Sequence, residues 1–131
     1  MKNYKDLEIY QEAKKLAIEI HGISLHLPRF ELYEEGSQIR LSSKAVASAI
    51  VEGYARRRYK AEFIRYLICA QAECDETLLH LEFLIEGKSM QDELKSGELR
   101  ARYDSLSKRI NKFTQWVEFH WKTTTRTSIQ E

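Results

Sequence analysis

Residues 99–120 read LRARYDSLSKRINKFTQWVEFH and contain the clearest structural signal in the chain. The side chains that define it recur in alternating steps of four and three residues, the spacing of one face of an α-helix. They are Leu99, Tyr103, Leu106, Ile110, Phe113, Val117 and His120. The stretch therefore predicts a long amphipathic helix that buries this face against its neighbours.

Three earlier stretches carry a similar period, at about residues 5–27, 32–57 and 59–85. Asp6 is expected to cap the first helix, and Pro28 to end it, because proline disfavours helical geometry in the residue before it. Gly87 is the predicted stop of the third helix. The fourth is expected to begin after Ser89, with a break at Ser96-Gly97.

No alternating strand pattern of any length occurs in the sequence. Four helices with short connections bury their apolar stripes best as a bundle. We therefore predict an all-α fold, a single-domain antiparallel up-down four-helix bundle over residues 1–122. Residues 123–131 are expected to form a flexible C-terminal tail, because their threonine-rich run has poor helix propensity.

Length and composition indicate one cytoplasmic domain. The chain has 131 residues, 43% of them hydrophobic and 31% charged, which is typical of a globular protein. Its formal net charge of +1 gives no global field that would attract nucleic acid or an anionic membrane. Two cysteines cannot make a disulfide framework, and no signal peptide or membrane-spanning apolar run is evident.

Residue patterns for catalysis or metal binding are weak. Bundle metal centres use Glu-x-x-His pairs, whereas the nearest pattern here is Glu76 and His80 at i,i+4, equally a surface ion pair. Cys69 and Cys74 lie five residues apart, so they cannot chelate one ion from a helix, and we interpret both as buried small side chains. Glycine-rich phosphate loops are absent. We expect no enzyme activity, cofactor or metal.

Charge is unevenly distributed along the chain. The second and fourth predicted helices are basic, and the third, residues 59–87, has two positive and six negative side chains. The densest basic cluster is Arg56-Arg57-Arg58, which Tyr54 and Tyr59 flank, a composition suited to phosphate contacts and base stacking. Two structural roles are also open, because these arginines would complement the helix dipole or pair with the acidic third helix.

Several separated motifs resemble a known family. They are Tyr4-Lys-Asp-Leu-Glu-Ile-Tyr-Gln-Glu-Ala13, Ser37-Gln-Ile-Arg40, Ser48-Ala-Ile-Val-Glu-Gly-Tyr54 with Arg56-Arg57, and Glu62-Phe-Ile-Arg-Tyr-Leu67. In order and spacing they are similar to the bacterial four-helix bundle proteins encoded in intervening sequences of the 23S ribosomal RNA gene. Leu41, Ala47 and Ala49 depart from the arginine, proline and asparagine usual there.

The resemblance implies an antiparallel bundle that assembles as a homopentamer. It also implies kinship in fold with accessory proteins of diversity-generating retroelements, which bind nucleic acid and a reverse transcriptase. Without its proline, the second helix is expected to be straight.

Two apolar features predict self-association. The first helix has a second apolar stripe of Ile9, Leu16 and Ile23, and the last helix ends in aromatic residues. The leading hypothesis is thus a non-enzymatic oligomer that contacts RNA or DNA through Arg40, Lys44, Arg56, Arg57, Arg58 and Arg65. The alternative is a protein-interaction adaptor in which the arginines only pair with Glu73, Asp75, Glu76 or Glu82. A metal-binding or small-molecule-binding bundle is a third, weaker hypothesis.

Overall fold

The computed structural model describes residues 3–122, so the predicted tail over 123–131 lies outside the described residues. A 3-10 turn, η1 (Tyr4–Asp6), precedes α1 (Glu8–Ser24) and the one-turn helix α2 (Arg29–Leu32). Three long helices follow: α3 (Glu35–Ala55), α4 (Lys60–Glu86) and α5 (Glu93–His120). Residues 3–122 contain no strand, which confirms the predicted all-α class.

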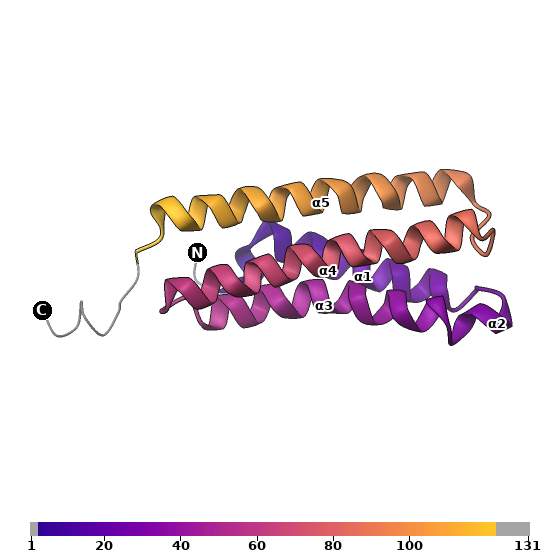
Figure 1. Cartoon of the computed structure of the whole chain (residues 1–131), viewed down its shortest axis with the longest axis horizontal. Helices are drawn as coiled ribbons and strands as arrows, with labels where there is room; N and C mark the ends of the chain where they lie inside the picture. Colours follow the sequence, from indigo (N-terminus) through magenta and orange to yellow (C-terminus); the bar gives the residue numbers. More distant parts are fainter. Residues whose placement is uncertain (1–2, 123–131) are drawn as a thin grey trace, which may run out of the picture.

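The four long helices form a bundle in which each packs against its neighbours in the sequence. Contacts join α1 to α3, α3 to α4 and α4 to α5, and α5 closes the ring against α1. Figure 1 shows that consecutive long helices run in opposite directions, as short connections require. The α3–α4 connection and the end of α5 therefore lie at one end of the bundle, and α2 lies at the other.

Three predicted helix boundaries are wrong. Pro28 does not end α1, which already stops at Ser24; Pro28 instead precedes the one-turn helix α2. Asp6 does not cap α1; its carboxylate accepts a hydrogen bond from the Asn3 N–H within the capping box of η1, and α1 begins only at Glu8. The predicted break at Ser96-Gly97 is also absent, because α5 runs through it unbroken from an Asp92 cap. A glycine costs a helix only about 1 kcal/mol, and the buried residues that follow it outweigh that cost.

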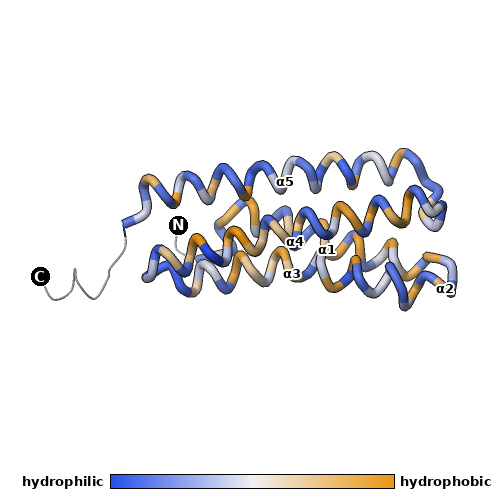
Figure 2. The backbone as a smooth tube through the Cα atoms, in the orientation of Figure 1, coloured by the Kyte–Doolittle hydropathy of each residue, from blue (hydrophilic) through white to orange (hydrophobic). Residues whose placement is uncertain are grey.

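Both apolar stripes of α1 pack inside the bundle. Ile9 and Leu16 are buried, and Ile23 packs partly buried against the core, because α1 lies between α3 and α5 and has two surfaces to cover. The expectation that this second stripe is spare surface is therefore wrong. Figure 2 shows hydrophilic and hydrophobic residues alternating along the helices, the pattern of one-sided burial.

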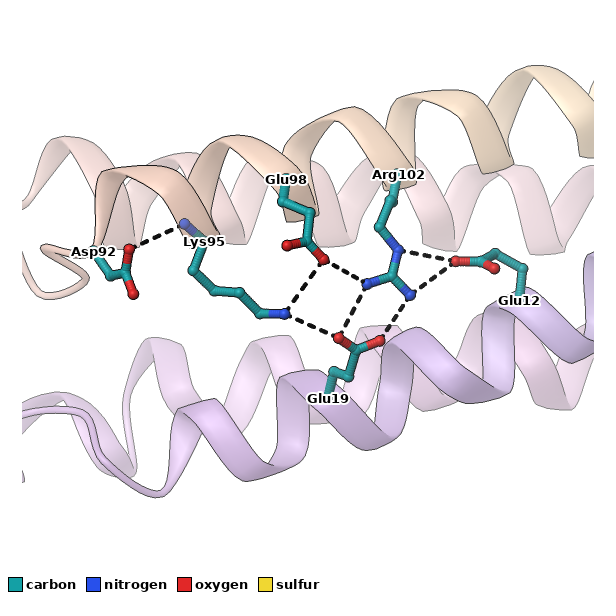
Figure 3. A network of polar contacts seen from close by, with 6 residues as sticks. All are labelled: Glu12, Glu19, Asp92, Lys95, Glu98 and Arg102. Carbon is teal, nitrogen blue, oxygen red and sulfur yellow. Dashed lines mark hydrogen bonds and ion pairs between the residues drawn. The ribbon is translucent and has the colours of Figure 1, made fainter.

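A network of charged side chains joins α1 to α5 (Figure 3). Arg102 lies at its centre and pairs with Glu12 at 3.0 Å, Glu19 at 2.7 Å and Glu98 at 3.0 Å. Lys95 adds a second cation, 3.0 Å from Glu19. Hydrogen bonds from Arg102, with help from Lys95, lower the pKa of Glu19 from 4.5 to about 2. The α1–α5 edge is thus held by ion pairs as well as by apolar packing.

Candidate nucleic-acid interface

Four of the six predicted contact residues gather where α3 turns into α4. Arg56, Arg57 and Arg58 form the connection itself, and Arg65 follows in the second turn of α4. We call these four residues the corner cluster. The turn is closed by backbone hydrogen bonds, among them one from the Tyr59 N–H to the Arg56 carbonyl at 2.8 Å.

Gly53 allows the two helices to come close enough to build this corner. A Cβ atom at Gly53 would lie 2.9 Å from the Cβ of Tyr66 and 3.4 Å from the Phe63 carbonyl oxygen. Any larger residue would therefore push α4 away from α3. The glycine brings Tyr66 within reach of the arginines that end α3.

Tyrosine rings hold the guanidinium groups of the corner cluster. The Cζ atoms of Arg56 and Arg65 lie 4.6 Å and 4.5 Å from the centre of the Tyr66 ring. Arg57 lies 4.1 Å from the ring of Tyr54, and Arg58 lies 6.0 Å from that of Tyr59. Each arginine therefore makes a cation–π contact that restricts its motion.

Arg56 and Arg57 also contact the carbonyl groups at the end of helix α3. Arg56 donates a hydrogen bond to the Glu52 carbonyl at 3.1 Å, and Arg57 donates to the Tyr54 carbonyl at 3.0 Å. Both cations thereby lie at C-terminal carbonyls of α3, as the helix-dipole interpretation expects, and the Tyr54 carbonyl also accepts the backbone N–H of Arg57 at 3.1 Å. These contacts are with the backbone and with tyrosine rings, not with the acidic residues of α4 named in the adaptor hypothesis.

Arg65 is held in addition by an ion pair on its own helix. Its guanidinium donates two hydrogen bonds to the Glu62 carboxylate, at 2.9 and 3.1 Å. This pairing lowers the pKa of Glu62. A guanidinium has five N–H donors, so Arg65 keeps donors that can reach an anion.

The other two predicted contact residues lie away from the corner. Arg40 is half-buried and donates to the Ser24 hydroxyl at 2.9 Å and the Leu32 carbonyl at 2.7 Å, which ties α3 to the end of α1 and to α2. At 1.5 Å per helical residue it lies about 24 Å from Arg56 along α3. Lys44 is exposed and lies about 18 Å from Arg56 by the same measure.

Residues at the C-terminal end of α5 complete the corner, a contact that the sequence alone does not predict. The indole N–H of Trp121 donates to the Arg57 carbonyl at 2.9 Å, and its ring packs against Phe63 with centroids 5.2 Å apart. The ammonium group of Lys60 donates to the Glu118 carbonyl. The aromatic residues near the end of the last helix are visible in the sequence, and they are the signal from which this contact could have been expected.

The cysteines and histidines of the described chain do not form a metal site. No group of three or more His, Cys, Asp or Glu side chains within residues 3–122 is placed to hold an ion. Cys74 is buried as expected, and burial raises the pKa of its thiol to about 12. Cys69 is exposed, so its interpretation as a buried residue is wrong; α4 directs it away from the core.

His80 is also placed differently from the expected surface pair. It is 9% exposed, and its Nδ1 lies 2.6 Å from the Glu35 carboxylate, whereas Glu76 lies 3.6 Å from Nε2. The histidine therefore joins α4 to the first residue of α3 in the fold.

No helix within residues 3–122 combines the length and the apolar character that a membrane span requires.

Comparison with known proteins agrees with the architecture. No curated protein matches the sequence. The family model described as 23S rRNA-intervening sequence protein matches residues 5–112, which include the first three long helices and most of α5. On that match, which covers most of its length, the chain belongs to the 23S rRNA-intervening sequence protein family.

Proposed function

We propose that this protein is a non-enzymatic, cytoplasmic helical bundle that self-associates and binds the phosphate backbone of RNA or DNA through the corner cluster. The observation that carries the proposal is the gathering of Arg56, Arg57, Arg58 and Arg65 at one end of the bundle. Arg40 and Lys44 are left out of this surface because of their distance from it.

The corner cluster is suited to phosphate because its cations are ordered before a ligand arrives. Guanidinium groups held over tyrosine rings lose less side-chain entropy on binding than free arginines would. Contacts of this kind fix a backbone and carry little base sequence information. Four phosphate contacts give weak binding at physiological salt, so repetition of the cluster in an oligomer would raise the overall affinity.

Exposed apolar side chains support self-association. Ile18, Leu41 and Ile68 are 63%, 64% and 54% exposed on α1, α3 and α4. Apolar patches on the surface of a soluble protein mark interaction sites. The family resemblance implies that the assembly is a homopentamer, and the mass of the purified protein in solution tests this part of the proposal.

Fluorescence anisotropy with a labelled oligonucleotide, measured over a series of salt concentrations, tests the nucleic-acid part. The double variant Arg58→Gln and Arg65→Gln should weaken binding and reduce the slope of log K against log salt by about two. Arg29→Gln, on α2 at the opposite end of the bundle, is the matched control and should change neither quantity. Binding that is absent, or unaffected by salt, would rule the proposal out.

The adaptor hypothesis has one observation in its favour, an apolar and acidic face on α4. Leu79 and Phe83 are 46% and 51% exposed, and Glu76 lies beside them in the helix. A basic partner protein, such as the reverse transcriptase implied by the resemblance, would complement this face. The adaptor hypothesis gains if charge reversal of Arg56, Arg57 and Arg58 dissociates subunits but leaves nucleic-acid binding unchanged.

A further inference from the structure

An exposed stack of aromatic rings on α5 lies next to the corner cluster. Phe113, Trp116 and His120 have nearly parallel rings, with centroids 5.9 and 5.5 Å apart and interplanar angles of 15° and 17°. Trp116 is 43% exposed, and Phe119 beside it is 80% exposed. The bundle thus exposes flat aromatic surface to solvent, outside its hydrophobic core.

A hollow of about 480 Å³ runs beside this stack, between α5 and the start of the chain. Phe113 and Trp116 form its aromatic wall, and its polar groups come from Asp6, Glu8, Arg109 and Lys112, with Arg109 lying 3.3 Å from the Glu8 carboxylate. Its volume falls in the range of small-ligand sites, about 300–1,000 Å³. The chemistry fits a nucleotide, because aromatic rings stack on a base, carboxylates accept hydrogen bonds from base amino groups, and cations pair with phosphate.

Trp121 connects the stack to the corner cluster. Its indole N–H bonds to the Arg57 carbonyl, and its ring centroid lies 6.1 Å from that of Trp116. One residue therefore touches both surfaces, and a strand lying over it would meet arginines on one side and aromatic rings on the other.

Charge favours an anionic occupant over this whole end of the bundle. The segments 4–8, 52–65 and 109–122 hold five acidic and nine basic residues, in a chain whose net charge is only +1. The basic residues are Lys5, Arg56, Arg57, Arg58, Lys60, Arg65, Arg109, Lys112 and Lys122.

We infer that the ring stack and the adjoining hollow bind unpaired bases of a single-stranded RNA or DNA whose phosphates lie on the corner cluster. The inference rests on the proposed function and narrows it to a class of nucleic acid. A duplex hides the faces of its bases, so it reaches the arginines but not the rings, whereas a single strand reaches both.

The test compares single-stranded oligonucleotides of about twelve nucleotides, dT and rU, with a duplex of the same length. Phe119→Leu and Trp116→Leu should each weaken single-strand binding roughly tenfold, leave duplex binding unchanged and leave the salt slope unchanged. Phe30→Leu is the matched control, because Phe30 is 72% exposed on α2 at the other end of the bundle. Phe119 is the safer site, since its exposed ring makes little contribution to folding, and far-UV circular dichroism checks both variants.

The outcomes separate the inference from the proposed function. Equal affinity for duplex and single strand, with no effect of either aromatic variant, overturns the inference and leaves the corner cluster as a phosphate site. Absence of binding to every oligonucleotide overturns both. A tenfold loss for dT and rU that spares the duplex supports base stacking on α5.

Discussion

Replacement of Arg102 by methionine tests whether the charged network between α1 and α5 stabilises the fold. Methionine keeps most of the aliphatic length of arginine but removes the cation that Glu12, Glu19 and Glu98 share. Three carboxylates then lie close together with Lys95 as the remaining cation of the network in Figure 3. We expect the free energy of unfolding to fall.

The magnitude follows from the pKa of Glu19. A fall from 4.5 to about 2 corresponds to about 3 kcal/mol of stability at neutral pH. The side chain of Glu19 is 27% exposed and Lys95 supplies part of the effect, so we expect the loss of Arg102 to cost about 2 kcal/mol.

The sign of the pH dependence follows from the lowered pKa. The unfolded state takes up a proton at Glu19 near pH 4.5, whereas the native state does so only near pH 2. The stabilisation is therefore complete above pH 4.5 and is lost as the pH falls toward 2. The difference between wild type and Arg102→Met should shrink to under half between about pH 7 and about pH 3.

Urea unfolding followed by circular dichroism, at several pH values, measures this difference. Lys108→Met is the matched control, because Lys108 is also a cation of α5 but pairs with Asp104 at 3.0 Å in an exposed position. Its cost should stay below about 0.5 kcal/mol at every pH. A cost for Arg102→Met as small as that of the control, or one that does not change with pH, would refute the reasoning.

Three further changes probe helix packing and thiol environment. Gly53→Ala should destabilise by about 1–3 kcal/mol, seen as a lower thermal midpoint, because its Cβ would lie 2.9 Å from that of Tyr66. Gly97→Ala should stabilise by about 0.5–1 kcal/mol, because nothing lies within 4 Å of its Cβ position in α5; an unchanged or lower midpoint would contradict this. A thiol reagent should modify Cys69 in the folded protein but Cys74 only in urea, because burial raises the pKa of the Cys74 thiol to about 12; rapid reaction of both without denaturant would show that the core opens.

The helices could be predicted from sequence because their apolar period is a local property. The steps of four and three over residues 99–120 identified α5 without knowledge of its neighbours. The start of α5 was harder to predict, because Ser96 and Gly97 disfavour a helix locally. The packing that overrides this preference involves residues distant in sequence. The second stripe of α1 shows the same limit: periodicity says that Leu16 is buried, but not that another helix of the same chain buries it.

The candidate site was predictable only where its residues are contiguous. Arg56, Arg57 and Arg58 stay together in any helix or turn, so the sequence alone places these three side chains near one another. Arg40 has the same charge, but its guanidinium points into the junction of α1 and α2, a direction that composition does not encode. The bond from Trp121 to Arg57 joins residues 64 positions apart and follows only from the bundle topology.

That bond has a consequence for how the protein is made. A ribosome completes the hairpin of α3 and α4 well before it reaches Trp121, so the arginine-bearing turn exists for a time without its aromatic neighbour. The indole can reach the turn only after α5 has been synthesised. Until then the turn lacks the hydrogen bond that Trp121 donates to the Arg57 carbonyl, and it is held by its own backbone hydrogen bonds.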